Sequence, residues 1–488
     1  MRRPVCGTAT TAAKTSFLSV FAAVRVFAVL ALLGALCLRA ADAVPRDVAF
    51  EALIADARGL PPEFAADALL RLSTSWRAAD PDVRRDLLDE AFERAYAAQE
   101  PYRRASTQYV PPDTRQGAQL FAYATSLTRV SLQVRTAELM AFVDPPHARE
   151  LFEWIDLNAA PSPCEDPLTP AVDEYYAAAS LLARRTFDGN RGDALRFLVL
   201  YLWQARLPAE MPAVARAMDR FRPEPSEAAY LETVLRSILE AGRPDPRGFS
   251  LANIDIVSRI GDLQAADRAR GILGWHLLEA LRAYLLVYLK GARCSDSASE
   301  ALVPATFNGL LRRMRADRDV KPIDGRSVRP SRMLGAARYD WYWQTPDARR
   351  LRDAAMQLHG SGPVPVPEKT RQTREWQAEA ERLLADIEQW HGTREPAERD
   401  FFYQKSVLFS RLIDIAPPSA IRTRALRGFV DFLRHSDIDR DRRPLWFAFV
   451  NRLRDMARGN NRREILDALA QSGHPVLSVY AQIDRLAP

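Results

Sequence analysis

Helical periodicity runs along nearly the whole chain after residue 44, and convincing strand patterns are scarce. In residues 83–98, apolar side chains recur at spacings of three and four: Leu87, Leu88, Ala91, Phe92 and Ala95. That spacing places them on one face of a helix. We therefore predict an all-α protein, a multi-helical array of about eighteen helices. Short turns between successive helices predict antiparallel helical hairpins.

Prolines fit this helical pattern because many of them stand where a helix starts. Four pairs predict a helix start, each with a side chain that can cap the helix before a proline at its first position: Asp80-Pro81, Asp144-Pro145, Thr169-Pro170 and Thr345-Pro346. Proline at the first helical position loses no hydrogen bond. No fixed period of 33 or 34 residues with a known repeat consensus occurs, so a degenerate α-superhelix and a compact helical domain both fit the pattern.

The amino terminus has the organisation of a secretory signal peptide, which we assign to residues 1–43. Basic residues extend to Arg25, an apolar run covers Val26–Leu38, and Ala41-Asp42-Ala43 forms a cleavage site. We expect cleavage after Ala43 and a periplasmic or secreted protein. The alternative is an uncleaved anchor in the inner membrane, which would place Arg25 in the bilayer core at a high cost.

The basic charge of the chain is concentrated in this signal peptide. The whole chain carries +6, and residues 1–43 contain five basic residues against one acidic residue. The mature protein is therefore close to neutral, at about +2. We expect no nucleic-acid partner, and no membrane span once the signal peptide is removed.

Three segments follow the signal peptide. We predict a large α-helical domain over residues 44–359, a linker at 360–367 (GSGPVPVP) and a carboxy-terminal helical bundle over 368–488. The longest helix is predicted over Leu263–Lys290. Within it, His276, Glu279 and Arg282 recur every third residue along an otherwise apolar surface, which predicts a central buried helix.

Two cysteines remain after cleavage, Cys164 and Cys294. In an oxidising compartment, an even pair predicts one disulfide bond. Two unpaired thiols are the alternative that the sequence leaves open.

Catalytic and metal-binding motifs are missing from the sequence. The six histidines are isolated, and no H-E-x-x-H, phosphate-binding loop or G-x-S-x-G motif occurs. Residues 436–443 (SDIDRDRR) begin like a calcium loop but lack its glycine and its final glutamate. We predict no metal and no cofactor, and no catalytic residue can be named.

One segment is so rich in basic and aromatic residues that we consider it a candidate binding site. Residues 312–338 contain nine basic residues against three aspartates, and the aromatic run YDWYW follows at 339–343. Such a combination can hold an anionic polymer, stack on sugar rings or receive an acidic partner. The candidate residues are Arg326, Arg329, Arg332, Arg338, Tyr339, Trp341, Tyr342 and Trp343. The alternative is that Trp341 and Trp343 fasten an irregular connection to the helical body while the arginines are merely solvated.

These observations favour an exported helical protein of the cell envelope that binds or scaffolds, with an envelope protein or a glycan as partner. The alternative function is an enzyme that acts on polysaccharide or cell wall, built as an all-α toroid with a carboxylate-lined groove.

Overall fold

The computed structural model describes residues 47–106, 109–159, 163–242, 251–272, 274–295, 297–326, 328–360, 365–392, 400–436, 443–457 and 462–486. The chain divides into two compact units, Met1–Leu53 and Ile54–Pro488. Of the first unit, only the beginning of helix α2 (Val48–Arg58) is described. The predicted signal peptide with its cleavage site after Ala43 lies outside the described residues, as does most of the calcium-like segment at 436–443.

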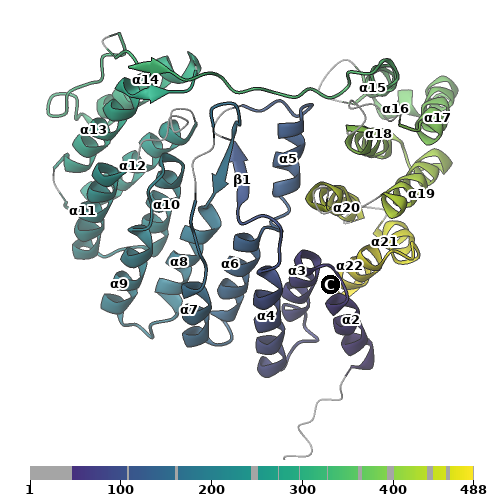
Figure 1. The fold of residues 1–488 in the computed structure, drawn as a ribbon, viewed down its shortest axis with the longest axis horizontal. Coiled ribbons are helices and arrows are strands. Elements are labelled where there is room, and N and C mark those ends of the chain that lie inside the picture. Colours follow the sequence, from purple (N-terminus) through teal and green to yellow (C-terminus); the bar gives the residue numbers. More distant parts are fainter. Residues whose placement is uncertain are drawn as a thin grey trace, which may run out of the picture. The chain divides into compact units, whose positions relative to one another are not determined.

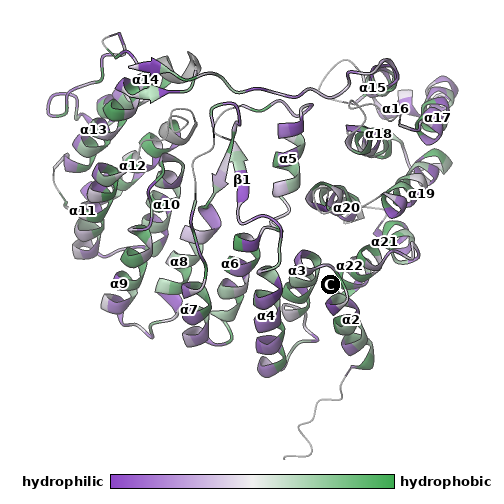
Figure 2. Ribbon diagram, viewed as in Figure 1, coloured by the Kyte–Doolittle hydropathy of each residue, from purple (hydrophilic) through white to green (hydrophobic). Residues whose placement is uncertain are grey.

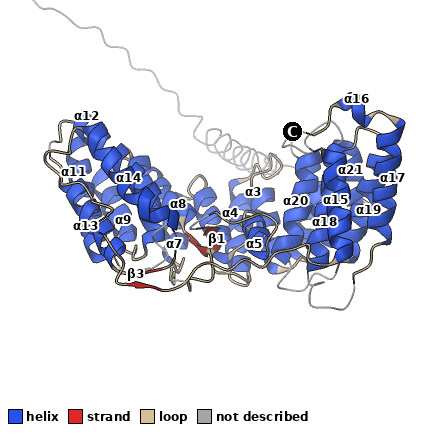
Figure 3. Ribbon diagram, turned by 90° about the horizontal axis from the view of Figure 1, so that it is seen from above, coloured by secondary structure: helices blue, strands red, loops and turns tan. Residues whose placement is uncertain are grey.

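The fold is all-α, as the periodicity predicts. The described residues form twenty-one α-helices and only two small sheets (Figure 3). Strand β1 (Arg103–Ser106) pairs antiparallel with β2 (Leu168–Ala171), and β3 (Ala292–Arg293) pairs parallel with β4 (Arg332–Met333). Among the described helices, none combines the length and the apolar character that crossing a membrane requires.

The first part of the larger unit is a two-layered run of helical hairpins (Figure 1). It begins with α3 (Pro62–Ser73), α4 (Pro81–Ala95) and α5 (Arg115–Tyr123). In one layer each helix packs on the next, in the order α6 (Arg129–Met140), α8 (Asp173–Arg185), α10 (Met211–Phe221), α12 (Leu251–Ala269) and α14 (Ser297–Met314). The connecting helices form the second layer: α7 (Pro145–Glu153), α9 (Arg191–Leu202), α11 (Pro225–Ala241) and α13 (His276–Lys290).

A second run of helices forms the carboxy-terminal part. Its members are α15 (Pro346–His359), α16 (Glu368–Arg371), α17 (Arg374–Gln389), α18 (Phe401–Ile415), α19 (Ala420–His435), α20 (Arg443–Ala457), α21 (Arg462–Ala470) and α22 (Pro475–Leu486). Helix α15 packs on α17 and α18, and α20 packs on α5. Residues 361–364 of the predicted linker lie outside the described residues, and the boundary between the two predicted helical domains stays a prediction.

Hydrophobic burial explains why these segments are helices. The five apolar residues of the α4 pattern are all buried, whereas the side of α4 that faces the viewer in Figure 2 is largely hydrophilic. Three predicted helix starts are confirmed: Asp80, Asp144 and Thr345 each accept a hydrogen bond from a first-turn backbone N–H. The fourth is wrong. Thr169 and Pro170 lie in β2, where they pair with β1, and α8 begins at Asp173.

The single long helix predicted over Leu263–Lys290 is also wrong. Helix α12 ends at Ala269, and Gly271 adopts a left-handed φ of +84°. Two hydrogen bonds close the end: Ile272 N donates to Asp267 O (2.9 Å) and Gly271 N to Arg268 O (3.0 Å). This is a Schellman cap, which glycine favours because it has no Cβ. His276 and Glu279 then lie on an exposed first turn of α13 rather than in the core.

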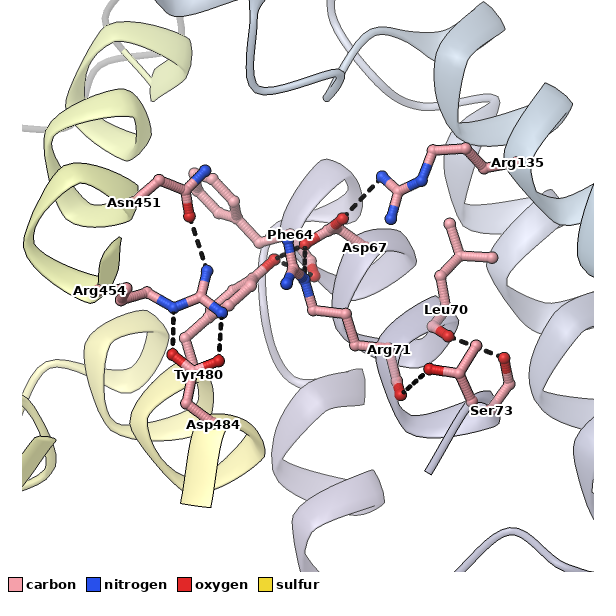
Figure 4. A network of polar contacts seen from close by, with 11 residues as sticks. Phe64, Asp67, Leu70, Arg71, Ser73, Arg135, Asn451, Arg454, Tyr480 and Asp484 are labelled. Carbon is pink, nitrogen blue, oxygen red and sulfur yellow. Dashed lines mark hydrogen bonds and ion pairs between the residues drawn. The ribbon is translucent and has the colours of Figure 1, made fainter. Parts of the chain in front are cut away.

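The first and last helices of the larger unit pack on each other through a buried polar network (Figure 4). The Asp67 carboxylate on α3 is fully buried and accepts hydrogen bonds from Arg71 (2.7 Å), Arg135 (2.8 Å) and the Tyr480 hydroxyl on α22 (2.8 Å). Burial alone would raise the pKa of Asp67, but the two guanidinium groups hold it well below its usual range. Asp67 therefore stays ionised and joins two ends of the sequence.

Candidate functional site

The predicted basic and aromatic segment forms an irregular connection between α14 and α15, residues 315–345, which we name the arginine-rich connection (Figure 1). Apart from the two residues of β4, its described part contains no helix or strand. Prolines and glycines break the helical pattern here, for example Pro322, Gly325 and Pro330. The arginines are therefore displayed on a loop rather than on a helix face.

The connection starts at a Schellman cap on α14 that has arginine where glycine is usual. Arg315 has a φ of +57°, Arg315 N donates to Arg312 O (3.2 Å), and Ala316 N donates to Leu311 O (2.9 Å). Ala316 and Leu311 are both fully buried, which supplies the apolar contact typical of this motif. The left-handed conformation costs a non-glycine residue about 1–2 kcal/mol.

The middle of the connection is joined to the loops around the disulfide bond. Cys164 and Cys294 are bonded to each other, with their Cα atoms 5.5 Å apart. Next to Cys294, β3 pairs with β4 of the connection. Next to Cys164, the carbonyl oxygen of Glu165 accepts a hydrogen bond from Arg338 N (3.0 Å). One covalent bond therefore ties both sides of this region together.

The aromatic end is held against α5 and the loop before it by backbone hydrogen bonds. Tyr342 N donates to Asp113 O (3.0 Å), and Arg115 N donates to Asp340 O (2.9 Å). An isolated bridge pairs Trp341 with Thr114. The connection is thus fixed in register at this end.

Tyr342 and Trp343 are buried, so they fasten the connection instead of offering a binding surface. Tyr342 stacks on Tyr403 of α18 with ring centroids 4.2 Å apart and planes 18° apart. Burial raises the pKa of Tyr403 to about 12, and its hydroxyl donates to Pro112 O (3.1 Å). Trp343 is 2% exposed although its φ is +65°, a strained conformation for a bulky residue that burial of the indole offsets.

An ion pair lies beneath this stack. Arg115 Nε donates to Asp400 Oδ1 at 2.9 Å, and its guanidinium also lies 3.9 Å from the Asp340 carboxylate. Burial raises the pKa of Asp400, and the hydrogen bond from Arg115 opposes that rise. These groups are bound to one another, so they do not form an open reactive site.

The four candidate arginines differ from the buried aromatic residues and ion pairs described above. Arg326, Arg329, Arg332 and Arg338 are all exposed, and their guanidinium groups make no ion pair or hydrogen bond with another described residue. Trp341 is 52% exposed, and Tyr339 is half-buried with its hydroxyl donating to Tyr109 O (2.9 Å). The eight predicted residues thus divide into an exposed set and a buried set.

No protein-family model, curated protein or solved structure matches this chain.

Sequence reasoning missed the groups that hold the connection in place. Asp113, Arg115, Asp400 and Tyr403 carry no motif, and they lie far from their contacts in the sequence: 61 residues separate Tyr342 from Tyr403, and 285 separate Arg115 from Asp400. Only the packing of α5 and α18 brings them together. Within the described residues, no group of three or more His, Cys, Asp or Glu side chains could hold a metal ion.

Two cavities lined by carboxylates in the described part of the chain are small. Asp219, Glu232 and Asp267 border one of about 10 Å³, and Glu63 and Glu100 border another of similar size. A cavity of that volume holds about one water molecule. Neither is large enough to accept a sugar chain. A larger, open cavity of about 570 Å³ is bordered by Glu388 of α17 and Asp431 of α19, and Arg424 pairs with Glu388 there.

Proposed function

We propose that this protein is an exported binding module of the cell envelope, whose arginine-rich connection engages an acidic partner. The observation that carries the proposal is a set of four exposed arginines on a loop fixed at both ends, whose guanidinium groups have no partner among the described residues. An unpaired guanidinium is available for bidentate contact with carboxylates or phosphates. Fixing the loop in advance lowers the entropic cost of binding.

The helical body supplies the frame for such a surface. Hydrogen bonds at Asp113, Glu165 and β3 hold the connection at separated points. Export supplies the oxidising environment in which a bond between Cys164 and Cys294 persists. Both features favour a rigid module that presents its charge on a fixed surface, and they argue against a mobile charged tail.

Binding to an acidic polymer tests the proposal directly. Poly-L-glutamate serves as the probe, and the variant replaces Arg326, Arg329, Arg332 and Arg338 by alanine. We expect at least about fourfold weaker binding, because each of the four exposed charge pairs contributes roughly 0.2–1 kcal/mol. Binding by the wild-type protein should also weaken as salt is added.

The matched control removes the same charge elsewhere. Arg374, Arg382, Arg427 and Arg463 are also exposed and lie on α17, α19 and α21. Their fourfold alanine variant should bind almost as the wild type does. Equal loss in both variants would mean that only net charge matters and would contradict the proposal.

The export part has a separate test. Mass spectrometry of the protein recovered from a bacterial periplasm should give an amino terminus at Val44. A full-length chain retained in the inner membrane would support the uncleaved anchor instead. Depolymerisation of cell-wall glycan by the purified protein would contradict the binding module and support the enzyme alternative.

A further inference from the structure

A separate surface of the helical body carries exposed aromatic side chains in a row. We propose that Tyr96, Trp154 and Trp203 form a binding platform for a neutral glycan strand. This goes beyond the proposed function, because none of these residues belongs to the arginine-rich connection. We name the three residues the aromatic row.

Each member of the row occupies the same place on its helix. Tyr96 follows the last residue of α4, Trp154 that of α7 and Trp203 that of α9. Their exposed fractions are 47%, 71% and 38%. Large aromatic side chains are usually covered when a helix end packs against its neighbours, so three successive exposed ones call for an explanation.

Helices α4 and α7 run parallel and in register. Near the middle of α4, Asp89 Oδ1 lies 2.7 Å from His147 Nε2 at the start of α7. Seven residues further along each helix, the Tyr96 hydroxyl donates to Trp154 O at 3.4 Å. The first two aromatic side chains of the row are therefore neighbours.

Helices α7 and α9 are aligned in the same way. The rings of Phe152 and Tyr201 meet edge to face with centroids 4.8 Å apart. Two residues further along each helix stand Trp154 and Trp203. In Figure 1, α7 lies between α4 and α9, so Trp154 is the central member of the row.

The buried rings below give the row a firm base. Phe152 also stacks on Tyr175 at 4.8 Å, and Phe197 contacts Tyr201 at 4.8 Å. The three side chains present flat aromatic rings, on which the apolar faces of sugar rings can lie.

Charge at the row favours a neutral glycan over a polyanion. The exposed charged residues within three residues of the row are Glu93, Glu153, Asp156 and Arg206, whose guanidinium donates to Trp203 O, so the row is acidic on balance. Carboxylates repel an acidic polymer but accept hydrogen bonds from sugar hydroxyls. The row and the arginine-rich connection therefore select different partners.

Isothermal titration with two neutral hexasaccharides, cellohexaose and chitohexaose, tests the platform. We expect the wild-type protein to bind at least one of them, and Trp154→Ala to bind it about tenfold more weakly. Tyr96→Ala and Trp203→Ala should also weaken binding, while Trp154→Phe should retain most of it because the flat ring remains.

Trp76→Ala is the matched control. Trp76 is 68% exposed and precedes α4, whereas Tyr96 follows it. The fifteen residues of α4 separate the two side chains by about 22 Å. This variant should bind the hexasaccharide as the wild type does. The variant that replaces Arg326, Arg329, Arg332 and Arg338 by alanine should also bind the hexasaccharide normally, because its weaker binding of poly-L-glutamate concerns the arginine-rich connection alone.

Three outcomes would overturn the inference. One is the absence of heat with either hexasaccharide at millimolar concentration, and another is equal weakening by Trp76→Ala. The third is a wild-type dimer in sedimentation experiments that Trp154→Ala converts to a monomer, because the row would then be an interface between two copies of the chain.

Discussion

Individual residues at helix ends decide where this chain turns. Side-chain caps are local, so the sequence predicts Asp80, Asp144 and Thr345 correctly. Thr169 shows the limit of the rule, because pairing with β1 outweighs the local preference for a helix start. The left-handed caps at Gly271 and Arg315 are harder to predict. The first lies inside an apolar pattern that continues past it, and the second uses a residue that disfavours the conformation.

Arg315→Gly should stabilise the protein, although it removes a side chain. Glycine adopts the φ of +57° without a Cβ clash, so we expect the free energy of unfolding to rise by about 0.5–1 kcal/mol. Urea unfolding measures the change. Arg313→Gly, in the last turn of α14, is the comparison and should destabilise. A loss of stability in Arg315→Gly would show that the cap does not strain its arginine.

Glu138 predicts a pH dependence. Burial raises its pKa to about 7, and the nearby Glu174 carboxylate adds to the rise. Because the folded pKa exceeds the ordinary value of 4.5, its contribution to stability is full below pH 4.5 and disappears as the pH rises through 7.

Glu138→Gln should therefore raise the melting temperature relative to the wild type at pH 8, and this gain should shrink towards pH 5. Thermal unfolding of both proteins across that interval measures the difference. Glu375→Gln, at an exposed position of α17, should show no such trend. A gain that is the same at every pH would contradict the assignment to Glu138.

At the scale of elements, most helices can be predicted from the sequence, but the arginine-rich connection can be predicted only in part. Its composition identifies it as irregular and basic. The division into exposed arginines and buried Tyr342 and Trp343 depends on α5 and α18, which approach it only in the folded chain. Sequence reasoning therefore finds the segment and misassigns two of its aromatic residues to the binding surface. The aromatic row was missed because alignment of α4, α7 and α9 is a tertiary property.

Loss of the disulfide bond should loosen this connection. Cys164 and Cys294 are 130 residues apart, so replacing both by serine should lower the free energy of unfolding by about 2–5 kcal/mol. Urea unfolding measures that loss. Trypsin should also cut the native variant faster than the wild type after Arg326 or Arg332, because β3 no longer holds the loop as firmly. Unchanged cleavage sites and rates would show that the bond does not restrain the connection.

At the scale of the whole molecule, the sequence predicts an all-α protein but not which helices meet. Contact between α3 and α22 joins Asp67 to Tyr480 across 413 residues. No periodicity encodes that pairing, since it depends on how every hairpin between them packs.

Variants of this network should show how strongly the two helices depend on each other. Asp67→Ala leaves the guanidinium groups of Arg71 and Arg135 without their buried carboxylate and should cost about 3–5 kcal/mol. Tyr480→Phe removes one hydroxyl and should cost about 1 kcal/mol. Urea unfolding measures both. Arg196→Ala, whose side chain is 77% exposed, should stay within about 0.5 kcal/mol of the wild type. Similar losses in all three variants would contradict a special role for the buried network.

The contact between α3 and α22 also fixes an order of events during synthesis. Tyr480 is synthesised 413 residues after Asp67, so the Asp67 carboxylate lacks its Tyr480 hydroxyl until α22 has emerged from the ribosome. The hairpins between the two helices can form earlier, but Asp67 becomes fully enclosed only when α22 has docked on α3.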